Sequence, residues 1–462
     1  MLFSTPFFVF LFLPVFFVGY WFLPARAWVL LLGSLVFYGW SEPVFLWVVV
    51  LSAWIDWLLG KRIVEGQPNR KPWLMAGLVA NLGLLFYAKY TVFAFENLNG
   101  LLNAFDWQSL AVPKIALPLG VSFIVFEKIT YLVDVYRGTA KPSESFLSYL
   151  NYVFLFPKLL AGPIVKYHDI AAQLNQPTHR YEDVRDGVIR FLTGLGKKVL
   201  LADLLAPVAD KAFDLPATAL DPATAWLGLV CFTLQIYFDF SGYSDMAIGM
   251  GRILGFRLAE NFRDPYLATS VTDFWKRWHI SLSTWIRDYL YFPLCGKRPS
   301  PARSYASLSA CFVLCGLWHG AAWHFVIFGC YHGLILVWDR AFGLELQKRL
   351  PRFVNMSLTL FLVMMSFIIF RCASVGQALQ YWAALAGSQA VAGNAVFLEH
   401  DTMTALCASL ALVFAPLARS HPGEKPLSPH RAPALLWACV LLLLCAGKMS
   451  VSTFHPFLYF QF

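Results

Sequence analysis

Three histidines and two carboxylates stand in strongly apolar stretches of the sequence, where ionisable side chains are costly and often functional. His319, His324 and His332 fall within 14 residues, and His319 and His332 each precede a glycine, which lets a backbone or substrate approach closely. Asp239 and Asp245 lie six residues apart, on different sides of one expected helix. The histidines predict either a functional site or core side chains hydrogen-bonded to carbonyls. The carboxylates predict either a proton or ion pathway, or ion pairs.

The spacing of these groups argues against metal binding and the common nucleophile motifs. His319 and His324 are five residues apart, His324 and His332 are eight apart, and no Glu lies between them, unlike a helical zinc site. The sequence has no G-x-S-x-G motif and no Gly-rich phosphate loop, and Cys315 is interpreted as packing. The nine cysteines form no CxxC pair. We therefore expect no metal and no tightly bound cofactor.

Helix-breaking residues accompany two of the polar stretches. Phe240–Gly242 separates the two aspartates and is expected to open their helix. If the aspartates form ion pairs, the expected partners are Arg252, Arg257 or lysines of the charged section that follows. Phe156–Pro163 contains two prolines and Gly162, which predicts a broken or re-entrant helix.

The section from Arg252 to Arg303 is charged but still aromatic, and Pro265 prevents a helix from running through its first part. The stretch Phe274–Leu290 predicts one amphipathic helix. Its apolar face carries Phe274, Trp278, Leu282, Trp285 and Tyr289. Another face carries Lys276, His279, Ser283 and Arg287. A basic amphipathic helix with Trp on its apolar side is typical of the membrane interface, and this simpler interpretation alone explains the pattern.

The elements that must position these groups are membrane-spanning helices. Of the 462 residues, 58% are hydrophobic and only 14% are charged, whereas soluble domains carry about 25% charged residues. This composition excludes a secreted enzyme, a nucleic-acid reader and a disordered scaffold. We predict one integral membrane domain, residues 1–462, with roughly 11 true spans and some re-entrant pieces. Apolar segments lie at about 6–24, 28–41, 44–60, 73–90, 115–136, 146–165, 189–207, 222–240, 243–256, 303–320, 321–341, 354–371, 402–418 and 432–450.

Basic residues predict the orientation in the membrane, because cytoplasmic loops are rich in Lys and Arg. The start, Met1–Pro24, lacks a basic n-region and a clear cleavage site and is expected to be a retained span. The loop after the third span carries Lys61, Arg62, Arg70 and Lys71, and the last loop carries Arg419, Lys425 and Arg431. Both termini are therefore expected outside. The net charge of +9 is interpreted mainly as this orientation charge, with an added attraction for a polyanionic substrate.

Five motifs occur in order along the chain and carry a resemblance. They are Phe156–Pro163, Tyr237–Asp245, Asn261–Tyr266, Phe274–Trp285 and Leu317–Gly320. Together with the opening segment Phe3–Pro14, they make the sequence resemble the membrane-bound O-acyltransferase family, in particular its alginate and cellulose O-acetylation branch. The long motif around His279 is the specific one. The resemblance runs from the N-terminus to about Arg340.

The resemblance implies an all-α bundle of roughly 11 transmembrane helices around a central tunnel, with a histidine at its narrow point. The family's invariant histidine corresponds to His319, and a second polar position corresponds to His279. His319 would act as a general base on the acceptor hydroxyl, a role that contributes about 10²–10⁴-fold. His279 would orient a substrate or polarise the thioester carbonyl. No role follows for His324 or His332, and an acetyl-enzyme intermediate is left open.

The resemblance also implies substrates, partners and location. The donor is expected to be acetyl-CoA, approaching from the cytoplasm near basic residues. The acceptor is expected to be an exported polysaccharide, reached through a periplasmic acetyltransferase partner beside a synthase and export complex in the bacterial inner membrane, with both termini periplasmic. Peptidoglycan or teichoic acid acylation remains an alternative, as does a transporter that uses the two aspartates for ion coupling. The predicted substrate-binding set is Lys276, Arg277, Trp278, Ser283, Arg287, Trp318, Asp239 and Asp245.

Overall fold

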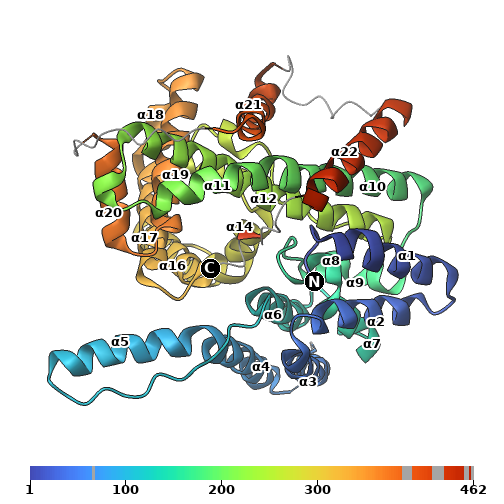
Figure 1. The fold of residues 1–462 in the computed structure, drawn as a ribbon. Helices are drawn as coiled ribbons and strands as arrows, with labels where there is room; N and C mark the ends of the chain where they lie inside the picture. The colour runs from blue at the N-terminus through green and yellow to red at the C-terminus, as the bar shows by residue number, and fades with distance from the viewer. Residues whose placement is uncertain (65–67, 388–397, 419–430, 452–456, 459–462) are drawn as a thin grey trace. The chain divides into compact units, whose positions relative to one another are not determined.

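The computed structural model describes residues 1–64, 68–387, 398–418, 431–451 and 457–458, and these residues form helices and connecting segments without a strand. The all-α prediction is confirmed. Internal contacts divide the chain into two compact units, which we describe separately. Unit 1 comprises Met1–Gly187 and Ala247–Ala259, and unit 2 comprises Val188–Met246 and Glu260–Phe462. Figure 1 shows the ribbon coloured along the chain, with labels on many helices of each unit.

Within the described residues, seven helices are long and apolar enough to cross a membrane. They are Pro43–Arg62, Arg70–Ala104, Pro222–Ile253, Trp323–Gln347, Arg352–Arg371, His400–Leu417 and Pro433–Val451. Two shorter apolar helices span Phe8–Phe22 and Arg26–Gly39. Many large apolar side chains on these helices are exposed, as lipid-facing surfaces require. The prediction of a polytopic membrane protein is confirmed.

Unit 1 is built around one buried helix that carries charged side chains. Its helices are η1 (Phe8–Phe12), α1 (Leu13–Phe22), α2 (Arg26–Gly39), α3 (Pro43–Arg62), α4 (Arg70–Leu85), η2 (Phe86–Tyr90), α5 (Thr91–Ala104), α6 (Val121–Arg137), α7 (Phe146–Phe154), α8 (Phe156–Leu159) and α9 (Tyr167–Asn175). The buried helix is α6, which contacts α3, α4, α7 and α9.

Buried ion pairs connect α6 to its neighbours. Lys128 Nζ of α6 lies 3.1 Å from Asp56 Oδ2 of α3. Asn81 of α4 donates to both carboxylate oxygens of Asp56, at 2.9 and 3.1 Å. The next residue on α6, Glu127, pairs with Lys158 of α8. A charge in an apolar interior is tolerated only when it is paired, so these contacts fix which helices are neighbours.

The prediction of a broken helix at Phe156–Pro163 is confirmed. The helix α7 ends at Phe154, and Leu155 leaves the helical conformation with φ −47° and ψ 98°. A single turn, α8, follows with Pro157 in its first turn, where the missing N–H costs nothing. The chain then continues without helix to Lys166.

Unit 2 is formed by the second half of the chain, together with parts of α10 and α12. Its helices are α10 (Tyr181–Gly196), η3 (Lys197–Ala202), α11 (Asp203–Asp214), η4 (Ala217–Ala219), α12 (Pro222–Ile253), η5 (Pro265–Leu267), α13 (Val271–Arg277), α14 (Ile280–Trp285), η6 (Ile286–Tyr291), α15 (Phe292–Cys295), α16 (Pro301–His319), α17 (Trp323–Trp338), η7 (Asp339–Gly343), α18 (Leu344–Gln347), α19 (Arg352–Arg371), α20 (Val375–Leu385), α21 (His400–Phe414), η8 (Ala415–Ala418) and α22 (Arg431–Val451).

The expected opening of the helix between the two aspartates is wrong, because α12 runs without a break from Pro222 to Ile253. It therefore unites two segments that we predicted separately. The glycine in question serves close packing instead. A Cβ on Gly242 would lie 2.7 Å from the carbonyl oxygen of Gly194 in α10, and one on Gly194 would lie 2.5 Å from the carbonyl oxygen of Gly242. The absence of both side chains lets the two backbones approach.

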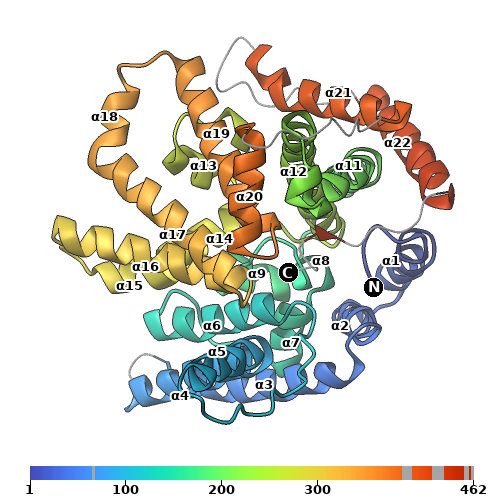
Figure 2. The ribbon, with the colours of Figure 1, turned by 60° about the vertical axis from the view of Figure 1, so that its left-hand side comes forward.

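The helices α16 and α17 pack against each other in the same way, and Figure 2 shows them side by side. A Cβ on Gly316 would lie 2.1 Å from the carbonyl oxygen of Phe325, and one on Gly329 would lie 2.3 Å from that of Phe312. This hairpin of helices holds His319 at the end of α16.

The substitution Gly329→Ala is expected to destabilise the protein by about 1–3 kcal/mol, because the added methyl group meets backbone that cannot move away. Thermal unfolding in detergent, followed by intrinsic fluorescence, measures the effect. Gly83→Ala in α4 is the matched control, since no atom lies within 4 Å of the added Cβ. Equal melting temperatures for the two variants would contradict the close packing of α16 and α17.

Candidate functional site

The predicted amphipathic helix Phe274–Leu290 is wrong, because the chain leaves the helical conformation at Trp278 and His279. Trp278 is extended, and His279 has a φ of 46°, in the left-handed region that non-glycine residues rarely adopt. A residue held there needs surrounding structure to stabilise it, and such residues concentrate at functional sites. The helices α13 and α14 therefore meet at His279.

The side chain of His279 is fully buried, with an exposed fraction of 0%, rather than lying on a polar face. The predicted apolar face is also mostly inside unit 2, since Phe274, Trp278, Leu282 and Trp285 are all buried. The simpler interpretation as an interfacial helix therefore fails. The periodicity correctly marks residues that avoid water, but their partners are protein side chains.

Asn261 determines the protonation pattern of His279. Its Oδ1 lies 3.1 Å from His279 Nδ1 and also accepts from Ser281 N and Oγ, at 3.2 and 2.9 Å. Its Nδ2 donates to Ser244 Oγ of α12 at 3.0 Å, which fixes the amide orientation. An amide oxygen can only accept, so His279 must carry its proton on Nδ1 and its lone pair on Nε2.

His279 lies outside the long apolar helices, and burial lowers the pKa of its imidazole to about 3. A lowered pKa means that the neutral form persists at every pH above that value. His279 is therefore a neutral imidazole at physiological pH, able to accept a hydrogen bond at Nε2.

His319 is the last residue of α16 and is 8% exposed. Its ring meets two phenylalanine rings edge-on, with centroids 6.0 Å away for Phe328 of α17 and 5.4 Å away for Phe370 of α19. Its Nε2 lies 3.9 Å from the Sγ of Cys315, one turn earlier on α16. The imidazole is thus held in a mostly aromatic environment formed by α16, α17 and α19.

Trp318 brings the two predicted catalytic histidines into one cluster. Its ring centroid lies 5.0 Å from that of His319 and 6.2 Å from that of His279. On the other side of His279, Phe240 of α12 makes an edge-on contact at 4.6 Å. Two motifs that are 40 residues apart in sequence, counted from His279 to His319, therefore share one aromatic neighbour.

The two aspartates of α12 lie in ion pairs, with partners other than the predicted Arg252 and Arg257. Asp239 Oδ1 lies 2.6 Å from Lys198 Nζ, and Asp239 Oδ2 accepts from the backbone N–H of Leu458 at 2.7 Å. Asp245 pairs with Lys197 at 2.6 Å and with Arg190 at 2.8 Å. The reason for the difference is the glycine contact between α10 and α12, which brings these basic residues to the aspartates.

The remaining predicted substrate-binding residues differ in accessibility. Lys276 is exposed, and Arg287 is 54% exposed although it pairs with Asp288 at 2.7 Å. Arg277 pairs with Asp273 of its own helix at 2.8 Å, and Ser283 is half-buried. Trp278 is buried in an aromatic cluster whose ring centroids lie between 5.0 and 6.3 Å away, formed by Tyr237, Phe262, Tyr266, Phe274 and Phe367. Lys276 and Arg287 are thus the cations of the set that a solute can reach most directly.

Comparison with known proteins identifies the chain. Residues 139–377 match the family model described as MBOAT, membrane-bound O-acyltransferase family. The chain is 39% identical to a probable alginate O-acetylase of Azotobacter vinelandii and 37% identical to one of Pseudomonas putida, in each case over the full length of both chains. The protein belongs to the membrane-bound O-acyltransferase family. It is also 36% identical to a peptidoglycan O-acetyltransferase of Helicobacter pylori, over 85% of this chain and 81% of that protein.

The matched region of this acyltransferase includes both candidate catalytic histidines and the whole aromatic cluster around Trp278. Among the described residues, no three His, Cys, Asp or Glu side chains are grouped so that they could hold a metal ion. An imidazole in its neutral form takes a proton from a hydroxyl or accepts a hydrogen bond, and the cluster holds two imidazoles.

The sequence reasoning missed several residues of this acyltransferase that position the site. Asn261 opens one of the quoted motifs but received no role, and Phe370 lies beyond the last motif. His332 is a core histidine, since its Nδ1 accepts from Trp275 Nε1 at 3.2 Å. The left-handed residue at 279 has a partial signal in sequence, because His, Asn and Asp are enriched at such positions.

Proposed function

We propose that this acyltransferase moves acetyl groups from a cytosolic thioester across the membrane to an exported polysaccharide of the alginate type. The observation that carries the proposal is the similarity to two probable alginate O-acetylases along the whole chain. Those relatives share the family and therefore the class of reaction, acyl transfer to oxygen. The acceptor and the donor are our inferences.

In the proposed reaction, His319 removes the proton of the acceptor hydroxyl while that oxygen attacks the thioester carbonyl carbon. The new C–O bond forms, the C–S bond breaks, and the departing thiolate takes the proton back from His319. His279 accepts a hydrogen bond at Nε2 and thereby orients one of the two substrates. The ring of Trp318 packs against both imidazoles and thereby holds them in a fixed position relative to each other.

We infer acetyl-CoA as the donor, because the exposed cations Lys276 and Arg287 offer an approach surface for a polyanion. We place the protein in the bacterial inner membrane with both termini periplasmic, supported by the basic loop after α3. Arg419 and Lys425, which support the orientation of the last loop, lie outside the described residues. Delivery beyond the membrane requires a periplasmic acetyltransferase partner and a polysaccharide synthase and export complex, which we propose as the partners.

A second acceptor, peptidoglycan, is favoured by the similarity to the Helicobacter pylori enzyme. The test is a deletion strain complemented with the wild-type gene, in which the O-acetyl content of alginate and of purified peptidoglycan is measured separately. Loss and recovery of acetyl groups on alginate alone supports the first acceptor. Loss on peptidoglycan alone supports the second, and an unchanged acetyl content of both polymers would refute both.

The pH dependence of acetyl transfer should not report His279. Burial lowers the pKa of His279 to about 3, so its ring stays neutral between pH 5 and 9, and its protonation should contribute no loss of activity in this range. The rate of acetyl transfer in liposomes between pH 5 and 9 gives the pH profile that tests this.

The variants His279→Asn and His279→Ala separate the two roles. Asparagine tolerates the left-handed backbone and can hydrogen-bond Asn261, whereas alanine can do neither well. We expect kcat to fall roughly 10²-fold in His279→Ala and less in His279→Asn, with the shape of the pH profile unchanged in both. A pH profile that changes shape in His279→Asn would show that His279 titrates between pH 5 and 9, contrary to the assignment.

A further inference from the structure

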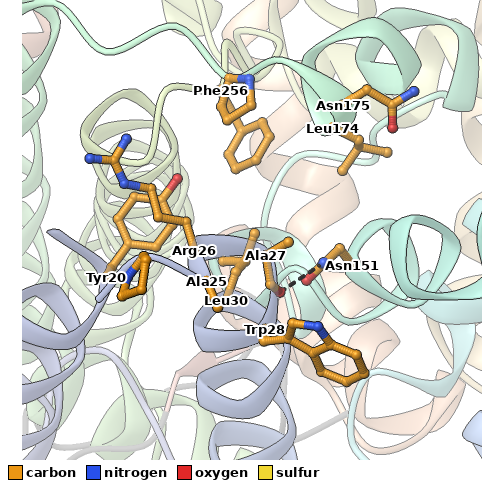
Figure 3. A pocket seen from close by; sticks show the side chains of 12 residues that line it. Tyr20, Ala25, Arg26, Ala27, Trp28, Leu30, Asn151, Leu174, Asn175 and Phe256 are labelled. Carbon is orange, nitrogen blue, oxygen red and sulfur yellow. Dashed lines mark hydrogen bonds between the residues drawn. The ribbon is translucent and has the colours of Figure 1, made fainter. Parts of the chain in front are cut away.

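Unit 1 contains a cavity of about 300 Å³ at the turn between α1 and α2. The residues that line it do not belong to the histidine cluster. Its walls include Arg26 and Trp28 of α2, Tyr20 of α1, Asn151 of α7 and Phe256 after α12 (Figure 3). Cavities of this size hold small ligands. Neither the proposed reaction nor the ion pairs described above use any of these residues.

The electrostatics of the cavity favour a negatively charged group. Arg26 is the first residue of α2, a helix of 14 residues with no acidic side chain in its first turn. The N-terminal amide groups of a helix and its macrodipole attract anions. Arg26 lies over the ring of Trp21, 5.2 Å from its centroid, and no described carboxylate forms an ion pair with it. The guanidinium and the helix end together offer a site for a phosphate.

Asn151 adds a second, independent requirement for the ligand of this cavity. Its side chain is only 4% exposed and lines the cavity. Its Nδ2 donates to the carbonyl oxygen of Ala27 at 3.0 Å, the contact drawn in Figure 3, and this bond fixes the amide orientation. Its Oδ1 is buried and has no hydrogen-bond partner. A buried acceptor without a partner is costly, so the ligand should carry an N–H or O–H donor beside its anionic group.

The position of the cavity identifies the source of such a ligand. The turn Leu23–Ala25 joins two apolar helices, and the flanking side chains Phe22 and Trp28 are both exposed, Trp28 by 55%. Exposed aromatic residues beside an arginine at helix ends are typical of the membrane–water boundary. A ligand that meets this surface comes most directly from the bilayer.

We propose that this cavity binds the headgroup of an ethanolamine glycerophospholipid. The phosphodiester contacts Arg26 and the N-terminal amides of α2, and the ammonium donates to Asn151 Oδ1. The acyl chains extend along the exposed apolar surface of α1 and α2. The site is independent of the proposed acetyl transfer, so either can fail without the other.

The test is native mass spectrometry of the delipidated full-length protein with equimolar ethanolamine, glycerol and choline phospholipids. Choline lipids carry the same phosphodiester but no N–H donor. We expect the ethanolamine lipid to be retained over the choline lipid in the wild type. Arg26→Gln should lower the affinity for the ethanolamine lipid roughly tenfold, since charge-assisted contacts to phosphate are the strong ones. Asn151→Leu should remove the preference for ethanolamine over choline.

Arg352→Gln is the matched control, because Arg352 is also an exposed first residue of a helix, α19, but lines no part of this cavity. Melting temperatures establish that each variant is folded. Equal retention of ethanolamine and choline lipids by the wild type would overturn the role of Asn151. Equal losses in Arg26→Gln and Arg352→Gln would overturn the site. Free phosphoethanolamine that competes as well as the lipid would show a soluble ligand and overturn the lipid assignment.

Discussion

Replacing His319 by alanine is expected to lower acetyl transfer by about 10²–10⁴-fold, the usual contribution of a general base. The imidazole sits at the end of α16 among Trp318, Phe328 and Phe370, three side chains that cannot take a proton from a hydroxyl. The measurement is transfer of labelled acetyl from acetyl-CoA by purified protein in liposomes, together with the acetyl content of the exported polymer.

His324→Ala is the matched control for this variant. His324 is half-buried, lies five residues further along the chain and belongs to none of the motifs. It should retain near wild-type transfer. A His319→Ala protein that folds normally and acetylates the polymer fully would contradict the assignment of His319 as the base. A protein that neither transfers nor hydrolyses acetyl groups but moves a solute would contradict the enzyme itself.

Replacing Lys158 by methionine is expected to destabilise the protein by about 3–5 kcal/mol, because the substitution leaves Glu127 as an uncompensated buried charge. Both side chains of this pair are essentially inaccessible to solvent. Methionine keeps the length of the lysine chain, so packing changes little. Thermal or denaturant unfolding in detergent measures the loss of stability, and yield from the membrane fraction gives a second readout.

Two controls separate charge burial from general disturbance. The double variant Lys158→Met with Glu127→Leu removes both charges and should recover most of the stability. Lys348→Met removes one partner of the exposed pair Lys348–Glu345, which should change stability by about 1 kcal/mol or less. If Lys158→Met and Lys348→Met unfold alike, the buried pair does not hold α8 against α6.

The long apolar helices could be predicted closely from the sequence, because a bilayer demands both length and apolar composition from a segment that crosses it. The helices α3, α19 and α22 lie within a few residues of the expected segments. The break after α7 was also predictable, since proline and glycine act locally. Segments with a clear local cause were therefore predicted well.

The positions of His279 and the two aspartates could not be predicted, because they depend on contacts between distant residues. The break at His279 is stabilised by Asn261, 18 residues earlier in the chain. The partners of Asp245 come from α10 and η3, 55 and 48 residues away respectively. Hydrophobic periodicity reports only that a side chain avoids water, and it does not report which neighbour covers it.

The hydrogen bond from Leu458 to Asp239 has a consequence for biosynthesis. These residues are 219 positions apart, and Phe457 packs against Phe240 and Tyr243 at ring-centroid distances of 5.8 and 4.8 Å. At ribosomal speeds of about 5–20 residues per second, Asp239 emerges roughly 10–45 s before its partner exists. The environment of α12 beside His279 is therefore completed only after Leu458 has been synthesised. A chain that stopped after α22 would contain the helices from η1 to α22 and still leave this part of the enzyme unfinished.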